Sequence, residues 1–190
     1  MAMTTKSTSS LSNALSARVQ DSLQVDHALS VALRHFRRLG AVRDGVREAY
    51  AEADTLRLHL DSNSMSWQSC STPVVSIQAG APSEDGTVRL DVTWHVLVGG
   101  GSESRLEARI DLVPLTSHCT AVYLEGRFRP PAAERSPAEP SSVDLQLSNV
   151  TVRAFLRHVA RAIDAKTAAD SQANASTPER RTKEGSRPTG

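Results

Sequence analysis

Strict alternation of apolar and polar residues marks the middle of the chain. Residues 88–96 and 106–112 each place an apolar side chain at every second position, with charged or polar side chains between them. This period of two predicts strands that bury one face and expose the other. The glycine-rich segment 99–102 between them suits a hairpin connection, because glycine tolerates a positive φ. Similar runs at 120–129 and, more weakly, at 74–79 extend the prediction to a meander of antiparallel strands.

Before the meander, the pattern changes from a strand to a helix. Residues 17–25 alternate as a strand does, whereas apolar residues over 26–39 recur at steps of three and four. Asp26 is the predicted N-cap of this helix, and Gly40 is predicted to end it. We therefore predict a first strand that leads directly into a short helix.

The next segment, 42–60, has two periods. Its first half has helical spacing, while the leucines of its second half alternate with polar residues, at Leu56, Leu58 and Leu60. In short apolar runs of this kind, periodicity alone does not distinguish a helix from a strand. We predict a short helix that runs into a strand.

A long amphipathic helix is predicted after the meander, over 141–165. Ser141 and Asp144 resemble a capping box at its start. Its apolar stripe, opposite arginines at 153, 157 and 161, consists of Leu145, Val152, Phe155, Leu156, Val159 and Ile163. A one-sided sheet needs such a helix to cover its apolar face. The prediction is a single α+β domain over 17–165, with disordered ends at 1–16 and 166–190, which are poor in large apolar residues.

Composition narrows the classes of partner. The chain of 190 residues has a formal net charge of +1, so no global charge draws it to nucleic acid. Its apolar runs are far shorter than the roughly 20 residues needed to cross a bilayer, so no membrane insertion is predicted. The two cysteines, Cys70 and Cys119, are too few for a disulfide framework, and the N-terminus has no continuous apolar stretch for export. We expect a cytoplasmic protein whose thiols, that of Cys119 included, are free and mostly buried.

The side chains that commonly carry catalysis are not arranged for it. His95 falls on the charged face of its predicted strand, and His118 is expected in a turn. Cys119 next to His118 on a strand would point to the opposite face, so the two cannot form a thiolate–imidazole pair. No histidine pair has zinc-site spacing, and the glycines at 99–101 lack the remaining residues of a phosphate loop. We predict no metal and no cofactor, and the catalytic residues, if the protein is an enzyme, stay unknown.

Large apolar side chains on the inner face of the sheet are candidates for a ligand cavity. A concave sheet covered by a helix can hold an apolar pocket lined by aromatic groups. Thr120 is the single polar side chain expected on that inner face. The predicted ligand-binding residues are Trp94, Thr120, Phe128, Phe155, Val152, Val159 and Trp67, with Tyr50 a further candidate. In a chain with only 4% aromatic residues the same side chains also suit a filled core, and both interpretations stay open.

Four segments within about 18–164 carry a likeness to a known family: Val92-Thr93-Trp94-His95, Asp111-Leu112-Val113-Pro114-Leu115, Leu124-Glu125-Gly126-Arg127-Phe128-Arg129-Pro130-Pro131, and Val150-Thr151-Val152-Arg153-Ala154-Phe155-Leu156. On these residues the chain resembles the START-like (SRPBCC) superfamily, and within it an uncharacterised actinobacterial group. The resemblance implies a helix-grip fold, in which a curved antiparallel β-sheet wraps around a long C-terminal helix, with short helices after the first strand. It also implies that a hydrophobic ligand lies between sheet and helix, as is typical of the superfamily, some of whose members act as polyketide cyclases or dehydratases.

Two hypotheses of function follow. The first is binding of a small hydrophobic molecule in the cavity between sheet and C-terminal helix, with or without a cyclase- or dehydratase-like reaction. The alternative is a non-enzymatic interaction or accessory protein with a filled core, whose tail, including Arg180, Arg181 and Lys183, contacts a protein partner. An enclosed cavity beside Trp94 and Phe155 favours the first, and close packing there favours the second.

Overall fold

The described part of the chain forms one strand, two helices, four further strands and a long helix, in this order. The computed structural model describes residues 16–60, 71–98, 102–131 and 142–175. The elements are β1 (Ala17–Val25), α1 (Leu29–Phe36), α2 (Leu39–Leu60), β2 (Val74–Ala79), β3 (Val88–Val98), β4 (Ser102–Thr116), β5 (Cys119–Arg129) and α3 (Ser142–Ala175). The strands form one antiparallel sheet in the order β1-β5-β4-β3-β2. The segment 99–101, predicted as a hairpin turn, lies outside the described residues.

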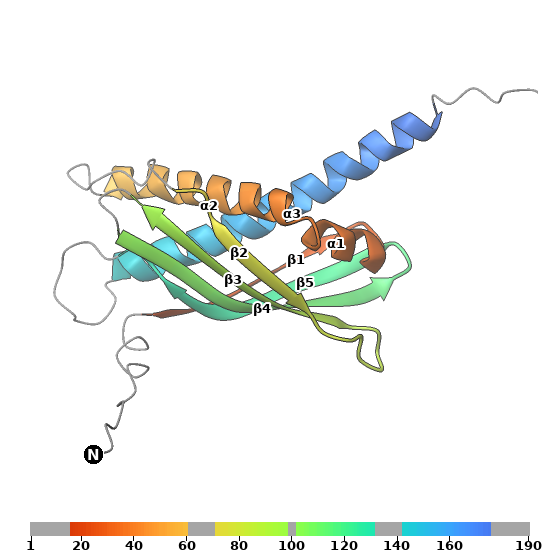
Figure 1. Cartoon of the computed structure of the whole chain (residues 1–190), viewed down its shortest axis with the longest axis horizontal. Helices are drawn as coiled ribbons and strands as arrows, with labels where there is room; N and C mark the ends of the chain where they lie inside the picture. Colours follow the sequence, from red (N-terminus) through yellow and green to blue (C-terminus); the bar gives the residue numbers. More distant parts are fainter. Residues whose placement is uncertain (1–15, 61–70, 99–101, 132–141, 176–190) are drawn as a thin grey trace, which may run out of the picture.

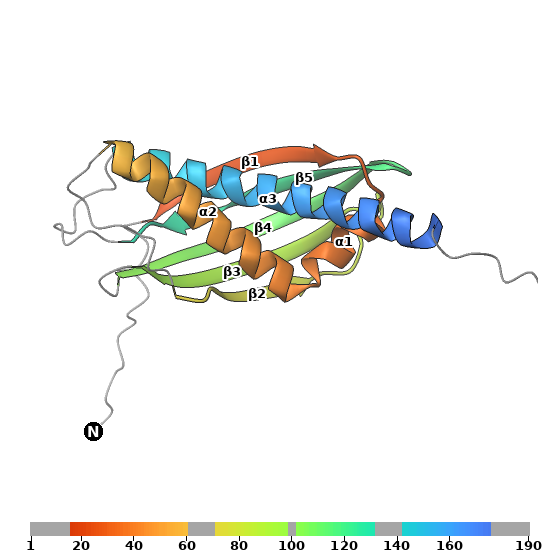
Figure 2. The same cartoon turned by 90° about the horizontal axis from the view of Figure 1, so that it is seen from above.

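The helices cover one face of this curved sheet. Figure 2 shows α2 and α3 lying side by side across the strands, with α1 at one end. α3 packs over β1 and against α2, and α2 also reaches the edge strand β2. None of the described helices lies on the opposite face of the sheet (Figure 1). The α+β class and the helix-grip arrangement predicted from the sequence are confirmed.

The register of the strands puts the predicted residues on the inner face. Trp94 in β3 pairs with Val75 of β2 and Leu106 of β4, and all three are buried. Its ring meets the ring of Phe155 in α3 with the centroids 4.9 Å apart, in an edge arrangement. The prediction that the side chain of Trp94 points toward the last helix is therefore confirmed. His95, the next residue, lies on the outer face among charged side chains, as predicted.

The first two helices differ from their predictions. The N-cap of α1 is Ala28, which has the extended backbone of an N-cap residue, and not the predicted Asp26. No side chain caps the start of this helix. α1 ends at Phe36, and Gly40 lies within α2 instead of ending the helix before it. The strand predicted for the leucines of 56–60 is also wrong, because α2 continues without a break to Leu60. Leu60 is half exposed, and the alternation of 56–60 lies in the last turns of this helix and not in a sheet.

α3 agrees with its predicted stripe except at its ends. Val152, Phe155, Leu156, Val159 and Ile163 are all buried. Leu145 is exposed, and Leu147 takes the buried place in that turn instead. The helix also runs past residue 165 to Ala175, beyond the predicted end of the domain. Ser141, the predicted cap, lies outside the described residues.

Gly126 in β5 is required by a close approach of two strands. It pairs with Ala108 of β4 and Val19 of β1. A Cβ atom at this position would lie 2.6 Å from the Cβ of Ala108 and would also collide with the carbonyl oxygen of Glu107. Only glycine allows β4 and β5 to lie this close where the sheet bends.

Candidate functional site

The aromatic residues predicted to line a cavity form the buried centre of the molecule. Trp94, Phe128 and Phe155 have no solvent-exposed surface, and neither does Tyr50 from α2. The rings of Tyr50 and Phe128 lie 6.2 Å apart. Since the Trp94 and Phe155 rings are in direct contact, these side chains pack against one another. Their role as ligand contacts stays a prediction.

A chain of hydrogen bonds runs through this centre. The indole Nε1–H of Trp94 donates to the hydroxyl of Tyr50 over 3.3 Å. The Tyr50 hydroxyl lies 2.5 Å from Oγ of Ser104, which in turn donates to the carbonyl oxygen of Arg129 at 2.8 Å. With Ser104 donating to that carbonyl, the Tyr50 hydroxyl is the donor to Ser104 and the acceptor from Trp94. The polar atoms in the centre are therefore partnered by the protein itself.

Sequence reasoning missed Ser104, although a signal was present. Ser104 is fully buried and stands two residues before Leu106 on the inner face of β4. Extending the alternation of 106–112 back by one step places it there. Thr120 was thus not the only polar group on the inner face.

The remaining predicted contacts have separate positions. Thr120 is buried, and its hydroxyl donates to the carbonyl oxygen of His27 at 2.8 Å, which ties β5 to the loop after β1. Val152 and Val159 are buried on the inner side of α3. Trp67 lies outside the described residues. The Thr120 hydroxyl is thus engaged in holding the fold together.

His95 lies on the outer face of the sheet, in a cluster of charged side chains. His95 Nδ1 lies 2.8 Å from Glu103 Oε1, and Arg129 Nη2 lies 3.1 Å from Glu103 Oε2. The hydrogen bond with His95 lowers the pKa of Glu103 below its ordinary value, and the charge of Arg129 lowers it further. All three side chains are partly exposed to solvent. They form a surface cluster, as the sequence predicts for His95.

His118 is exposed in the turn between β4 and β5, also as predicted, whereas Cys119 after it is only half-buried.

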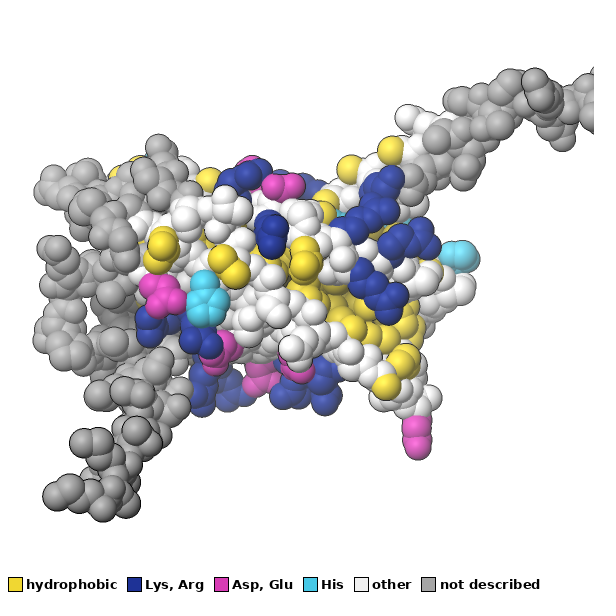
Figure 3. All heavy atoms as spheres, viewed as in Figure 1, with side chains coloured by type: hydrophobic (Ala, Val, Ile, Leu, Met, Phe, Trp, Pro, Cys, Tyr) yellow, Lys and Arg dark blue, Asp and Glu magenta, His cyan; other side chains and the backbone are white. Residues whose placement is uncertain are grey.

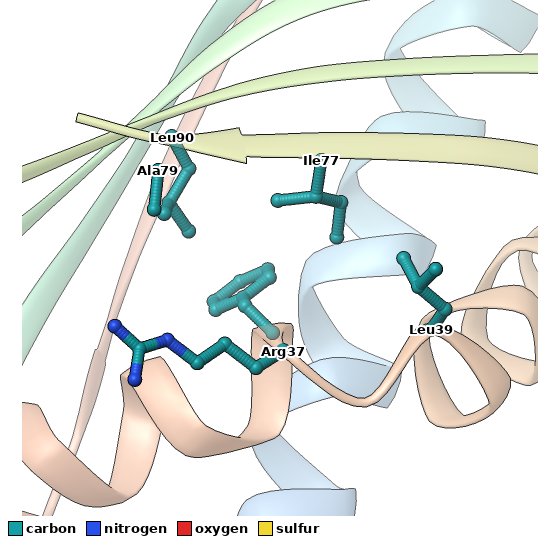
Figure 4. A pocket seen from close by; sticks show the side chains of 6 residues that line it. Arg37, Leu39, Ile77, Ala79 and Leu90 are labelled. Atoms are coloured by element: carbon teal, nitrogen blue, oxygen red, sulfur yellow. The ribbon is translucent and has the colours of Figure 1, made fainter.

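A pocket that no sequence pattern indicated opens at the corner between α1 and α2. It has a volume of about 190 Å³ and lies between this corner and the strands β2 and β3. Figure 4 shows its strand side made by Ile77, Ala79 and Leu90. Its helix side is made by Phe36, Leu39 and Arg37. Five of the six lining side chains are apolar, and the sixth is a cation.

The pocket borders on the core and on an arginine-rich surface. Phe36 and Leu90 are buried, whereas Leu39 is 40% exposed. In Figure 3 an apolar patch is visible at this end of the molecule, with basic side chains along its margin. Arg37 is exposed at the end of α1, and its guanidinium has no hydrogen bond or ion pair within the described part of the chain. The pocket therefore combines an apolar interior with an unneutralised positive charge.

A buried histidine, His35, lies in α1 next to Phe36, which lines the pocket. Its side chain is almost fully enclosed by the protein, and its Nε2 has no hydrogen-bond partner among the described residues. Burial lowers the pKa of His35 below its ordinary value, and the charge of Arg38 lowers it further. The neutral imidazole is therefore the form that the folded protein favours.

A second, wider hollow lies on the outer face of the sheet around Gly126. Charged side chains of both signs line it: Arg18, Asp91, Glu107, Arg109, Glu125 and Arg127. Arg18 and Glu125 are paired at 2.5 Å, so part of this charge is already neutralised. Its mixed charges select no single class of ligand.

Comparison with known proteins finds likeness in structure only. No protein-family profile matches the chain, and no curated protein has a significantly similar sequence. Among solved structures, the chain is similar to TTHA0849 of Thermus thermophilus, with 10% identity, a TM-score of 0.46, and 79% of this chain and 99% of that one covered. It is also similar to the Zhui aromatase/cyclase of Streptomyces sp. R1128, with 10% identity, a TM-score of 0.41, and coverage of 80% and 96%.

A third similar structure is described as a START superfamily protein, from Mycobacterium smegmatis. It is 13% identical, with a TM-score of 0.37, and the match covers 78% of this chain and 97% of that one. At this level of identity the likeness concerns the path of the chain and not the chemistry of a site.

Proposed function

We propose that the protein binds a small hydrophobic molecule, and that its apolar body enters the pocket at the α1–α2 corner. The supporting observation is the lining: five apolar side chains from two helices and two strands around about 190 Å³. A cavity of about 150 Å³ lined by Leu, Ile and Phe is sufficient for benzene. The ligand expected here is therefore the size of one ring or a short alkyl chain, smaller than the usual drug-sized ligand.

The pocket supports binding better than catalysis. A cyclase or dehydratase would need a proton donor or acceptor next to the ligand. Among the lining residues only Arg37 is polar, and a guanidinium stays protonated in proteins and is no general base. We therefore assign no catalytic step to this site.

A pair of tryptophan substitutions on one strand tests the proposal. Ala79 is exposed and lines the pocket, so Ala79→Trp is expected to fill it without disturbing the core. Gln78 is its exposed neighbour on β2 and points to the other face of the sheet, so Gln78→Trp is the matched control. Both variants add the same side chain to the same edge strand.

Thermal unfolding with a panel of one-ring and short-chain molecules provides the measurement. A ligand present at about 100 times its Kd stabilises a fold by about 2.7 kcal/mol, which corresponds to a rise in Tm of roughly 5 to 10 °C for a domain of this size. We expect that rise in the unmodified protein and in Gln78→Trp, and its loss in Ala79→Trp. Equal rises in both variants would place the ligand elsewhere.

The packed aromatic centre favours a second candidate, the accessory protein with a filled core. Trp94 and Phe155 touch, and the Trp94 indole is hydrogen-bonded within the protein. The tail residues expected to contact a partner, Arg180, Arg181 and Lys183, lie outside the described residues. No rise in Tm with any compound, together with no small molecule retained in native mass spectrometry, would favour this candidate.

A further inference from the structure

Arg37, at the mouth of the corner pocket, differs in its surroundings from two arginines of the sheet, Arg89 and Arg18. On the outer face, Arg89 is paired with Asp111 at 3.0 Å and Arg18 with Glu125 at 2.5 Å. Arg37 has no such partner within the described residues, although its side chain lines the pocket. In Figure 4 it extends along the end of α1, on the side of the pocket that faces Ala79 and Leu90.

The positive charge at this corner is shared by several side chains. Arg34, Arg38 and Arg43 are exposed and likewise have no ion pair in the described parts of the chain. A basic residue at the C-terminal end of α1 is favoured by the helix dipole, which accounts for its presence there. The dipole does not account for a guanidinium placed against an apolar pocket. A ligand with a negative group would account both for the positive charge at this corner and for the position of the Arg37 guanidinium against the pocket.

We propose that the ligand of this pocket is an acid, with its apolar body among Phe36, Ile77 and Leu90 and its oxyanion paired with Arg37. The planar guanidinium offers two parallel N–H donors that match a carboxylate or a phosphate. The neighbouring arginines raise the local concentration of anions and so speed association. This inference rests on the proposed function and adds to it the chemical class of the ligand.

Two substitutions with the same change of charge test the role of Arg37. Arg37→Gln removes the guanidinium that lines the pocket. Arg43→Gln removes one that is exposed nearby in α2 but is not part of the lining. Both lower the net charge by one, so an effect of overall charge is common to the two variants. Both sites are on the surface, so both variants are expected to fold.

The probes are acids and neutral amides with the same apolar body: benzoate with benzamide, and hexanoate with hexanamide. Calorimetry on the full chain is expected to give about tenfold tighter binding of each acid than of its amide, the effect of one charge-assisted hydrogen-bonded pair. Arg37→Gln should abolish this preference. Arg43→Gln should keep it and only slow association at low salt. Phenyl phosphate against benzoate then separates a phosphate site from a carboxylate site.

The outcomes distinguish the inference from the proposed function. Equal affinity for acids and amides would overturn the inference and leave the proposed function standing. Equal loss of preference in Arg37→Gln and Arg43→Gln would also overturn it, because the effect would then be one of general charge. Failure of every probe to bind would overturn the proposed function, and the inference with it.

Discussion

Removing the hydroxyl of Tyr50 tests whether the aromatic centre is a dry, self-contained core. In Tyr50→Phe the ring stays in place, while the acceptor for the Trp94 indole and the donor to Ser104 are lost. Ser104 keeps its own acceptor, the carbonyl oxygen of Arg129. The main cost is therefore the Trp94 N–H, which is left without this partner in a fully buried position.

The size of the effect follows from that unpaired donor. A buried polar group without a partner costs about 1 to 3 kcal/mol. For a domain of this length, each kcal/mol lowers Tm by about 2 to 4 °C, so a decrease of about 3 to 10 °C is expected. The chain offers a matched control, because its only other tyrosine, Tyr123, is 48% exposed on the outer face. Tyr123→Phe should change the free energy of unfolding by less than about 0.5 kcal/mol.

Urea unfolding of both variants is the primary assay, with the m-value as a check that the unfolded state is unchanged. Hydrogen exchange of the indole N–H adds a local readout. The chain has two tryptophans, and the Trp94 indole should exchange slowly in the unmodified protein and faster in Tyr50→Phe. If Tyr50→Phe were as stable as Tyr123→Phe, the indole would have water as its partner. The centre would then be hydrated, and the cavity predicted beside Trp94 would regain support.

Two further predictions concern the fold. Gly126→Ala should destabilise the protein by about 1 to 3 kcal/mol, because the new Cβ overlaps strand β4. Gly45→Ala in helix α2 should stabilise it by about 0.5 to 1 kcal/mol, because its Cβ would meet side-chain atoms of Phe155 and His158 only at ordinary contact distances of 3.6 to 3.9 Å. Urea midpoints compare the two variants, and a harmless Gly126→Ala would contradict the close approach of the strands. His35 has a pKa below its ordinary value of 6.5, so unfolding takes up a proton below that pH and the free energy of unfolding should fall as the pH drops below 6.5. His35→Leu should flatten part of this slope in urea unfolding between about pH 5 and 7.5, and an unchanged slope would show that other groups produce it.

The strands could be predicted from the sequence because the sheet has one dry and one wet face. A shift of one residue would send Trp94 into water and His95 into the core, so the alternation fixes the register. The same argument applied to all of β4 would have found Ser104, since a buried serine keeps the period even though it is polar. Binary patterning therefore fails at the positions where a polar side chain is partnered inside the core.

The corner pocket could not be predicted in this way. Its lining comes from two segments, 36–39 and 77–90, that are distant in the sequence and meet only through the tertiary fold. Ile77 and Ala79 follow the period of β2, but nothing local indicates that the turn between α1 and α2 lies opposite them. That Arg37 has no ion pair among the described residues is likewise a property of the folded surface.

The incorrect prediction for 42–60 and the unpredicted position of the pocket have one cause. A short helix followed by a strand would have left the inner face of the sheet covered by α3 alone, with room beside Trp94. Instead α2 continues to Leu60 and lies beside α3 across the sheet. Its inner side places Val46, Ala49, Tyr50 and Ala53 in the core, all fully buried. With the centre occupied by α2, the corner pocket lies where the chain turns from α1 into α2, beside Arg37.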